Sequence, residues 1–171
     1  MIGRPTELEA APFHQRYIAH VVGEDPLLAL ERQQGEALAL FAGISEERSL
    51  GRYEAGKWSL REVLQHISDA ERVFGFRALW FARCFGGELA GFDQDVGVLE
   101  GQADRVAWAV HVEEFRRARE GTIALFRSMP EEAWLRTGVA SGKMVSVRAL
   151  AFLCAGHAEH HLQMVRERYL G

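Results

Sequence analysis

The stretch KWSLREVLQHISDAERVF, Lys57–Phe74, decides the fold because it carries both the start signal and the period of a packed helix. Ser59 can cap a helix with its hydroxyl while Glu62, three residues later, completes a capping box. Apolar residues then recur at helical spacing and predict one buried face: Leu60, Val63, Leu64, Ile67 and Phe74. We expect this helix to run from about Ser59 to Phe85, before a pair of glycines.

The same signals predict three more helices. The first follows the N-cap Asp25, has Pro26 at its first helical position and ends at Gly43. Another covers about residues 103–129 and is closed by Pro130, and the last runs from the N-cap Ser146 to about residue 169. No segment competes with the alternating period of a strand, so we expect an all-α four-helix bundle.

Two links between the helices lack a strong period. The segment GGELAGFDQDVGVLEGQ, residues 86–102, is rich in glycine and predicts a long crossover loop. The segment EEAWLRTGVASGKMV, residues 131–145, predicts an irregular link. We expect a single domain over residues 1–171, made of an N-terminal lead-in at 1–23 and the bundle at 24–170.

Composition excludes several classes of partner. A formal charge of -4, from 20 basic and 24 acidic residues, leaves no basic stripe for a phosphate backbone, so we expect no nucleic acid. The two cysteines are far apart, which argues against a disulfide scaffold. No apolar run approaches the ~20 residues of a membrane span, and the N-terminus lacks the apolar region of a leader. We therefore expect a soluble, unprocessed cytoplasmic protein with no membrane partner.

Three of the seven histidines lie in CAGHAEHHLQMVRERYL, Cys154–Leu170. At the helical period, His157 and His161 fall within roughly 20° of the centre of the apolar face, and His160 falls about 80° away. The i, i+4 spacing allows His157 and His161 to chelate one ion. The alternative is that both are core histidines with ordinary hydrogen bonds.

A third ligand would be needed to hold a divalent ion firmly. His66 lies beside the apolar face of the helix that starts at Ser59, so we expect it to be at least half-buried. His14 and His20 precede the bundle and His111 lies in a charged run, so we expect these three to be solvated.

Two motifs carry a family resemblance. GKWSLREVLQHISDAERVFGFRAL, Gly56–Leu79, resembles the signature of the DinB/YfiT-like superfamily, and GHAEHHLQMVRER resembles its terminal HxxxH. GFDQDV and EEFRRARE are similar to its crossover and third helix, so the resemblance spans roughly Tyr17 to the C-terminus. It implies a four-helix bundle of unusual connectivity, often a homodimer, in which His66, His157 and His161 bind a divalent metal, commonly zinc or nickel.

Three imidazoles would leave an open position on the ion, which favours catalysis over a purely structural site. The resembled superfamily includes transferases of low-molecular-weight thiols, so the leading hypothesis is such a transferase acting on a small-molecule substrate. One alternative is a hydrolase that uses metal-bound hydroxide, and another is a non-catalytic metal-binding stress-response protein. The sequence assigns no catalytic residue.

Three further side chains allow two interpretations each. Glu71 either orients a ligating imidazole or forms an ion pair. Arg77 either meets an anionic substrate or forms a salt bridge to Asp69, to Glu71 or to a neighbouring helix. Cys154 is either a fourth ligand or, as we expect, a small buried hydrophobe. The excess of aromatic surface around Phe76 and Trp80 is consistent with a dimer face or a thick core.

Overall fold

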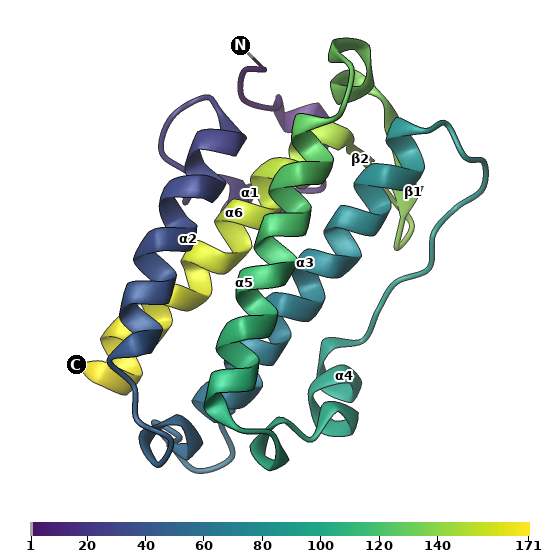
Figure 1. Ribbon diagram of the computed structural model, residues 1–171. Helices are drawn as coiled ribbons and strands as arrows, with labels where there is room; N and C mark the ends of the chain where they lie inside the picture. Colours follow the sequence, from purple (N-terminus) through teal and green to yellow (C-terminus); the bar gives the residue numbers. More distant parts are fainter. Residues whose placement is uncertain (1) are drawn as a thin grey trace.

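A computed structural model describes residues 2–171 and shows a bundle of four long helices, as the sequence predicts (Figure 1). These helices are α2 (Pro26–Ala42), α3 (Leu60–Ala82), α5 (Trp108–Arg127) and α6 (Val147–Met164), and α6 continues as a π-helical end at Val165–Leu170. The expected caps form: Asp25 and Ser146 each accept backbone hydrogen bonds, and Ser59 and Glu62 form the capping box. Short 3₁₀ turns occupy Glu7–Glu9, Arg48–Leu50, Ala103–Arg105 and Glu131–Leu135.

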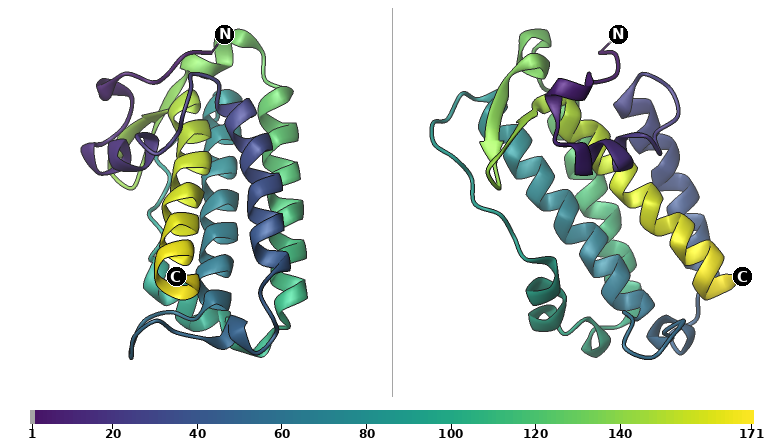
Figure 2. Two further views of the ribbon diagram at one scale, coloured as in Figure 1. Left: turned by 90° about the vertical axis from the view of Figure 1, so that its left-hand side faces the viewer. Right: turned by 180° about the vertical axis from the view of Figure 1, so that it is seen from behind.

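The helices pack in an order that differs from their order in the chain. α3 and α2 each pack against both α5 and α6, so α2 and α3 lie diagonally across the bundle. α3 and α5 both start at the same end of the bundle, and the connection between them returns along the outside (Figures 1 and 2). The predicted crossover is therefore what lets two packed helices run in the same direction.

The crossover and the second link contain structure that the sequence analysis did not predict. The crossover includes a short helix, α4 (Gln94–Gly101), which Asp93 caps and which contacts α3. Its glycines and its short length hide any helical period. The expected irregular link contains a hairpin, β1 (Thr137–Ala140) paired antiparallel with β2 (Lys143–Ser146). The prediction that no strand occurs was wrong. Each strand has only four residues, which is too short for an alternating period to be recognised in the sequence.

The hairpin turn rests on a specific backbone geometry. Ser141 and Gly142 connect the two strands, and both have positive φ, at 54° and 69°. Two central residues with positive φ are the mark of a type I′ turn, in which the twist matches that of the flanking strands. This turn places Ser141 and Lys143 next to the bundle.

The N-terminal lead-in also contains a helix, α1 (Pro12–Ile18), which packs across α6. The contact is close at Gly156, where an added Cβ would lie 2.0 Å from the carbonyl oxygen of Tyr17. A side chain at this position of α6 would therefore push α1 away.

The apolar core has two parts that meet near the middle of the bundle. On α3 the residues up to Ile67 belong to one cluster and those from Ala70 onward to the other. On α6 the division falls between Ala155 and Ala158. His66 and His157 therefore lie where the two clusters adjoin. Among residues 2–171, no helix is both long enough and apolar enough to cross a membrane.

Candidate metal centre

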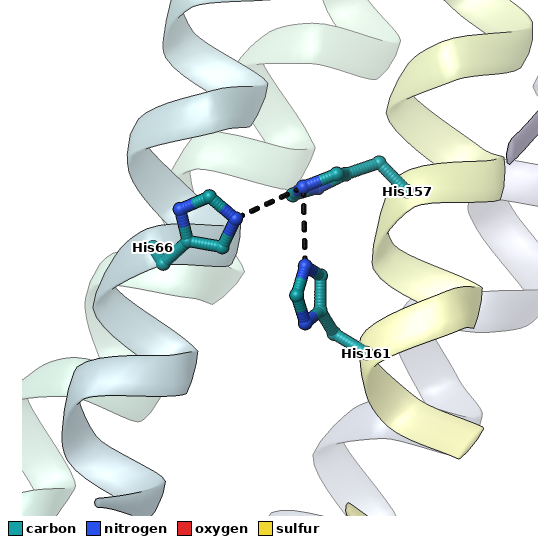
Figure 3. A group of neighbouring side chains, drawn as sticks. All are labelled: His66, His157 and His161. Atoms are coloured by element: carbon teal, nitrogen blue, oxygen red, sulfur yellow. Dashed lines mark hydrogen bonds between the residues drawn. The ribbon is translucent and has the colours of Figure 1, made fainter. Parts of the chain in front are cut away.

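Three histidines converge between α3 and α6 (Figure 3). His66 comes from α3, and His157 and His161 come from successive turns of α6. Nε2 of His157 lies 3.0 Å from Nε2 of His66 and 3.2 Å from Nε2 of His161. The potential ligand atoms of the three residues all lie within 4.8 Å of one another. The structure thus brings together the three histidines that the sequence analysis selected.

Burial keeps the three imidazoles neutral. Their exposed fractions are 3% for His66, 6% for His157 and 8% for His161. Burial lowers the pKa of His66 to about 4 against a weaker opposing effect of Asp69 and Asp95. Burial and the neighbouring histidines lower the pKa of His161 to about 3 and hold the pKa of His157 well below its ordinary value. At neutral pH each ring therefore keeps a lone pair, which metal ligation requires.

The geometry fits a metal better than it fits hydrogen bonds alone. A neutral imidazole nitrogen carries either one proton or one lone pair, so Nε2 of His157 cannot form good hydrogen bonds to both partners. A single cation would interact with all three lone pairs at once. Two imidazole nitrogens on a tetrahedral zinc ion lie about 3.3 Å apart, close to both observed separations. The donor set and its spacing therefore suit a divalent ion.

Aromatic rings surround the cluster and limit its contact with water. Trp58 lies with its ring centroid 5.0 Å from that of His66, and Tyr17 and Phe74 lie 5.3 and 5.8 Å from His157. Nδ1 of His161 is buried without a hydrogen-bond partner. Low polarity around the rings strengthens any charge interaction made there.

Glu71 does not orient an imidazole. Its carboxylate forms a buried, bidentate ion pair with Arg119, with Nε–Oε1 and Nη2–Oε2 distances of 2.7 and 2.9 Å. Gln33 and the carbonyl of Leu30 accept the remaining hydrogen bonds of Arg119. Of the two interpretations of Glu71, the structure shows the ion pair, which connects α3 to α5.

Cys154 lies outside the group of converging ligand atoms among the described residues. Its side chain packs within the apolar core, and burial raises the pKa of its thiol well above the ordinary value. A protonated thiol in such a setting acts as a small hydrophobe, which is the expected interpretation.

The expectation that His14, His20 and His111 are solvated was wrong for His111, which is buried, and the other two are half-buried. His111 is 3% exposed, and its Nε2 lies 2.9 Å from the carbonyl oxygen of Ala103, which ties α5 to the turn before it. His14 is half-buried on α1, with Nδ1 unpartnered. His20, also half-buried, lies against the exposed His160. Periodicity could not place these residues because their burial depends on neighbours distant in sequence.

A cavity of about 320 Å³ opens onto the histidine cluster. Its lining includes His66 and His157 together with side chains from α1, the crossover and the hairpin: Phe13, His14, Tyr17, Phe92, Gln94, Ser141 and Lys143. The sequence did not indicate this second set because the segments that carry it are too short to show a helical or strand period. Pro12 before an apolar residue and the Ser141-Gly142 pair were the available signals for α1 and for the turn.

Arg77 also lines this cavity, and the salt bridge considered for it does not form. Its Nη2 donates to the carbonyl oxygen of Ala90 and to Oγ of Ser141, both at 3.0 Å. No carboxylate in residues 2–171 lies within ion-pairing distance of its guanidinium.

Comparisons with known proteins agree with this architecture. A sequence model of the DinB superfamily matches residues 29–165. YfiT from Bacillus subtilis, described as a probable metal-dependent hydrolase with an unusual four-helix bundle topology, superposes with a TM-score of 0.70. That alignment covers 95% of this chain and 89% of YfiT at 15% sequence identity, so the likeness is one of fold. No curated protein matches in sequence.

Proposed function

This chain belongs to the DinB superfamily, and from that premise we propose that it is a metal-dependent hydrolase with a three-histidine site. The observation that carries the proposal is the convergence of the Nε2 atoms of His66, His157 and His161 beside a cavity that His66 and His157 line. The description of YfiT as a probable metal-dependent hydrolase supports the same activity. It favours the hydrolase alternative over the thiol transferase that the sequence analysis placed first.

His66, His157 and His161 would hold the ion. Imidazole donors suit zinc and nickel among the common divalent metals. When bound, such an ion keeps a coordination position for water or a carbonyl oxygen, lowers the pKa of that water and polarises that carbonyl. The protein itself supplies the orientation of the substrate and the exclusion of water.

The cavity positions the substrate beside the histidines. Tyr17 and Phe74 contact the ring of His157 and form an apolar wall next to it. A substrate that fills the cavity displaces water from this wall and brings its scissile group to the cluster, so orientation and partial desolvation come from the chain itself.

Hydrolysis of a panel of carboxylic esters and amides tests the proposal. We expect the zinc- or nickel-loaded protein to hydrolyse at least one member, the metal-free protein to lose the activity, and His161→Ala to stay inactive after loading. His160→Ala is the matched control, because His160 is the adjacent, exposed residue on the same helix, and it should keep the activity.

A second arm adds a low-molecular-weight thiol and an electrophile. Conjugation of the thiol without hydrolysis of any ester or amide would replace the hydrolase with the thiol transferase. Failure of both reactions with a fully loaded site would support the non-catalytic metal-binding protein.

A further inference from the structure

Three arginines of this chain are buried, and one of them differs from the other two. Arg61 is 4% exposed and pairs with Glu46, and Arg119 is fully buried and pairs with Glu71. Arg77 is 5% exposed, yet no carboxylate in residues 2–171 lies within ion-pairing distance of it. A buried charge without a counter-ion is costly, so the isolation of Arg77 requires an explanation.

The hydrogen bonds of Arg77 hold the guanidinium without neutralising it. Both come from Nη2, which reaches the carbonyl oxygen of Ala90 in the crossover and Oγ of Ser141 in the hairpin turn. The ring of Phe92 lies 6.0 Å from the guanidinium carbon. Nε and Nη1 have no acceptor among the described residues. Three N–H groups of a fixed fork therefore remain for a ligand.

The lining of the cavity around Arg77 has the charge of an anion site. Arg77 and Lys143 are the cationic side chains of its lining, and none of the lining residues carries a carboxylate. Phe74 and Phe92 add apolar wall. Arg77 follows His66 by about three turns of α3, and helical side chains lean toward the N-terminus. Arg77 and two members of the histidine cluster, His66 and His157, line the same cavity.

We propose that this cavity binds an anionic substrate, with a carboxylate or phosphate group held by Arg77 and Lys143 while its other end reaches the three histidines. A planar guanidinium with free parallel N–H groups binds such an anion through two charge-assisted hydrogen bonds. The bound anion provides the counter-charge that Arg77 lacks within the protein. That the bound anion is a substrate rests on the proposed function, whereas the presence of an anion site does not.

Calorimetric binding of three matched probes to the full chain tests the site: phenylacetate, phenyl phosphate and the neutral phenylacetamide. The metal-free protein is used first, because a bound metal would itself attract an anion. We expect the preferred anion to bind at least about tenfold more tightly than phenylacetamide, the effect of a charged hydrogen-bonding pair. Preference for phenylacetate or for phenyl phosphate identifies which anion the site takes.

Arg77→Gln should remove this preference, while Arg127→Gln, at an exposed arginine paired with Glu31, should leave it intact. Circular dichroism of each variant establishes that it folds. If Arg77→Gln does not fold, Lys143→Gln on the exposed hairpin should still weaken anion binding severalfold without affecting phenylacetamide.

Three results would overturn the proposal: equal binding of the anions and the amide to wild type, a preference that survives in folded Arg77→Gln, or a preference that appears only after metal loading. None of them depends on hydrolysis. A protein that binds the anions through Arg77 but hydrolyses nothing would contradict the proposed function and leave the anion site standing.

Discussion

His160 and His161 are adjacent in the chain, yet the fold gives them different surroundings. His161 faces the bundle interior with His157 and His66, whereas His160 is exposed and lies against Tyr17 and His20. This difference follows from the helical period, because consecutive residues point about 100° apart. It makes the neighbouring residues a matched pair for experiment.

Alanine replacement of single histidines should divide them into two classes. His66→Ala, His157→Ala and His161→Ala should each lose most bound metal, because two imidazoles form a weak site. His160→Ala should keep nearly the wild-type stoichiometry. Mass-spectrometric metal analysis after zinc loading and gel filtration measures the content. Loss of metal in His160→Ala together with retention in His161→Ala would show that α6 presents another face to the metal.

At the scale of elements, the contact between α1 and α6 depends on one glycine. Gly156→Ala should lower the free energy of unfolding by roughly 1–3 kcal/mol, because the new Cβ would overlap the backbone of Tyr17. Gly121→Ala, in the exposed part of α5 with no atom within 4 Å of an added Cβ, should raise it by about 0.5–1 kcal/mol. Urea denaturation measures the free energy of unfolding of both variants. A change of the same sign in the two would contradict the close packing of α1 against α6.

The N-terminal segment is also tied to α6 by an ion pair, which predicts a pH dependence. Burial raises the pKa of Glu9, but hydrogen bonds from Arg148, Thr6 and Ser146 outweigh this effect and hold the pKa at about 2. Because the ordinary pKa is 4.5, the stability contributed by Glu9 is complete above that pH and is lost as the pH falls toward 2.

Glu9→Gln should therefore be less stable than wild type at pH 7, and the difference should shrink at pH 3. Urea denaturation at the two pH values measures it, with the exposed Glu24→Gln as a control that changes little at either pH. A difference that stays constant between pH 7 and pH 3 would mean that the ion pair does not set the pKa of Glu9.

For the whole molecule, metal binding should be coupled to folding. The histidines come from α3 and α6, so the site exists only when the bundle is formed. Free zinc at a hundred times its Kd should raise the free energy of unfolding by about 2.7 kcal/mol. Thermal melts with and without zinc should show the rise in wild type and little change in His161→Ala. An equal rise in both would place the stabilising zinc elsewhere.

The homodimer remains a prediction at this scale. Phe76 and Phe85 are each about half exposed, and both rings pack against Trp80 on the outside of α3. Light scattering on the full chain determines whether this surface pairs with a second copy.

The sequence by itself determined the four long helices, their caps and the placement of His157 and His161 together on one buried face. These depend on local signals: a capping residue, an apolar period of 3.6 and the position of a histidine relative to the apolar face. The choice of His66 as the third member of the candidate cluster came from the family resemblance. The convergence of the three rings also needed α3 to pack on α6, which the family resemblance implied.

Only the tertiary structure decided what surrounds the cluster. α4, the hairpin and α1 are too short for a period to be detected, and they lie where they do because of contacts with α3 and α6. The partner of Glu71, the burial of His111 and the isolation of Arg77 from carboxylates also depend on residues far away in the chain. Local patterns show which side of a helix is buried, but the identity of the neighbouring side chain comes from long-range packing.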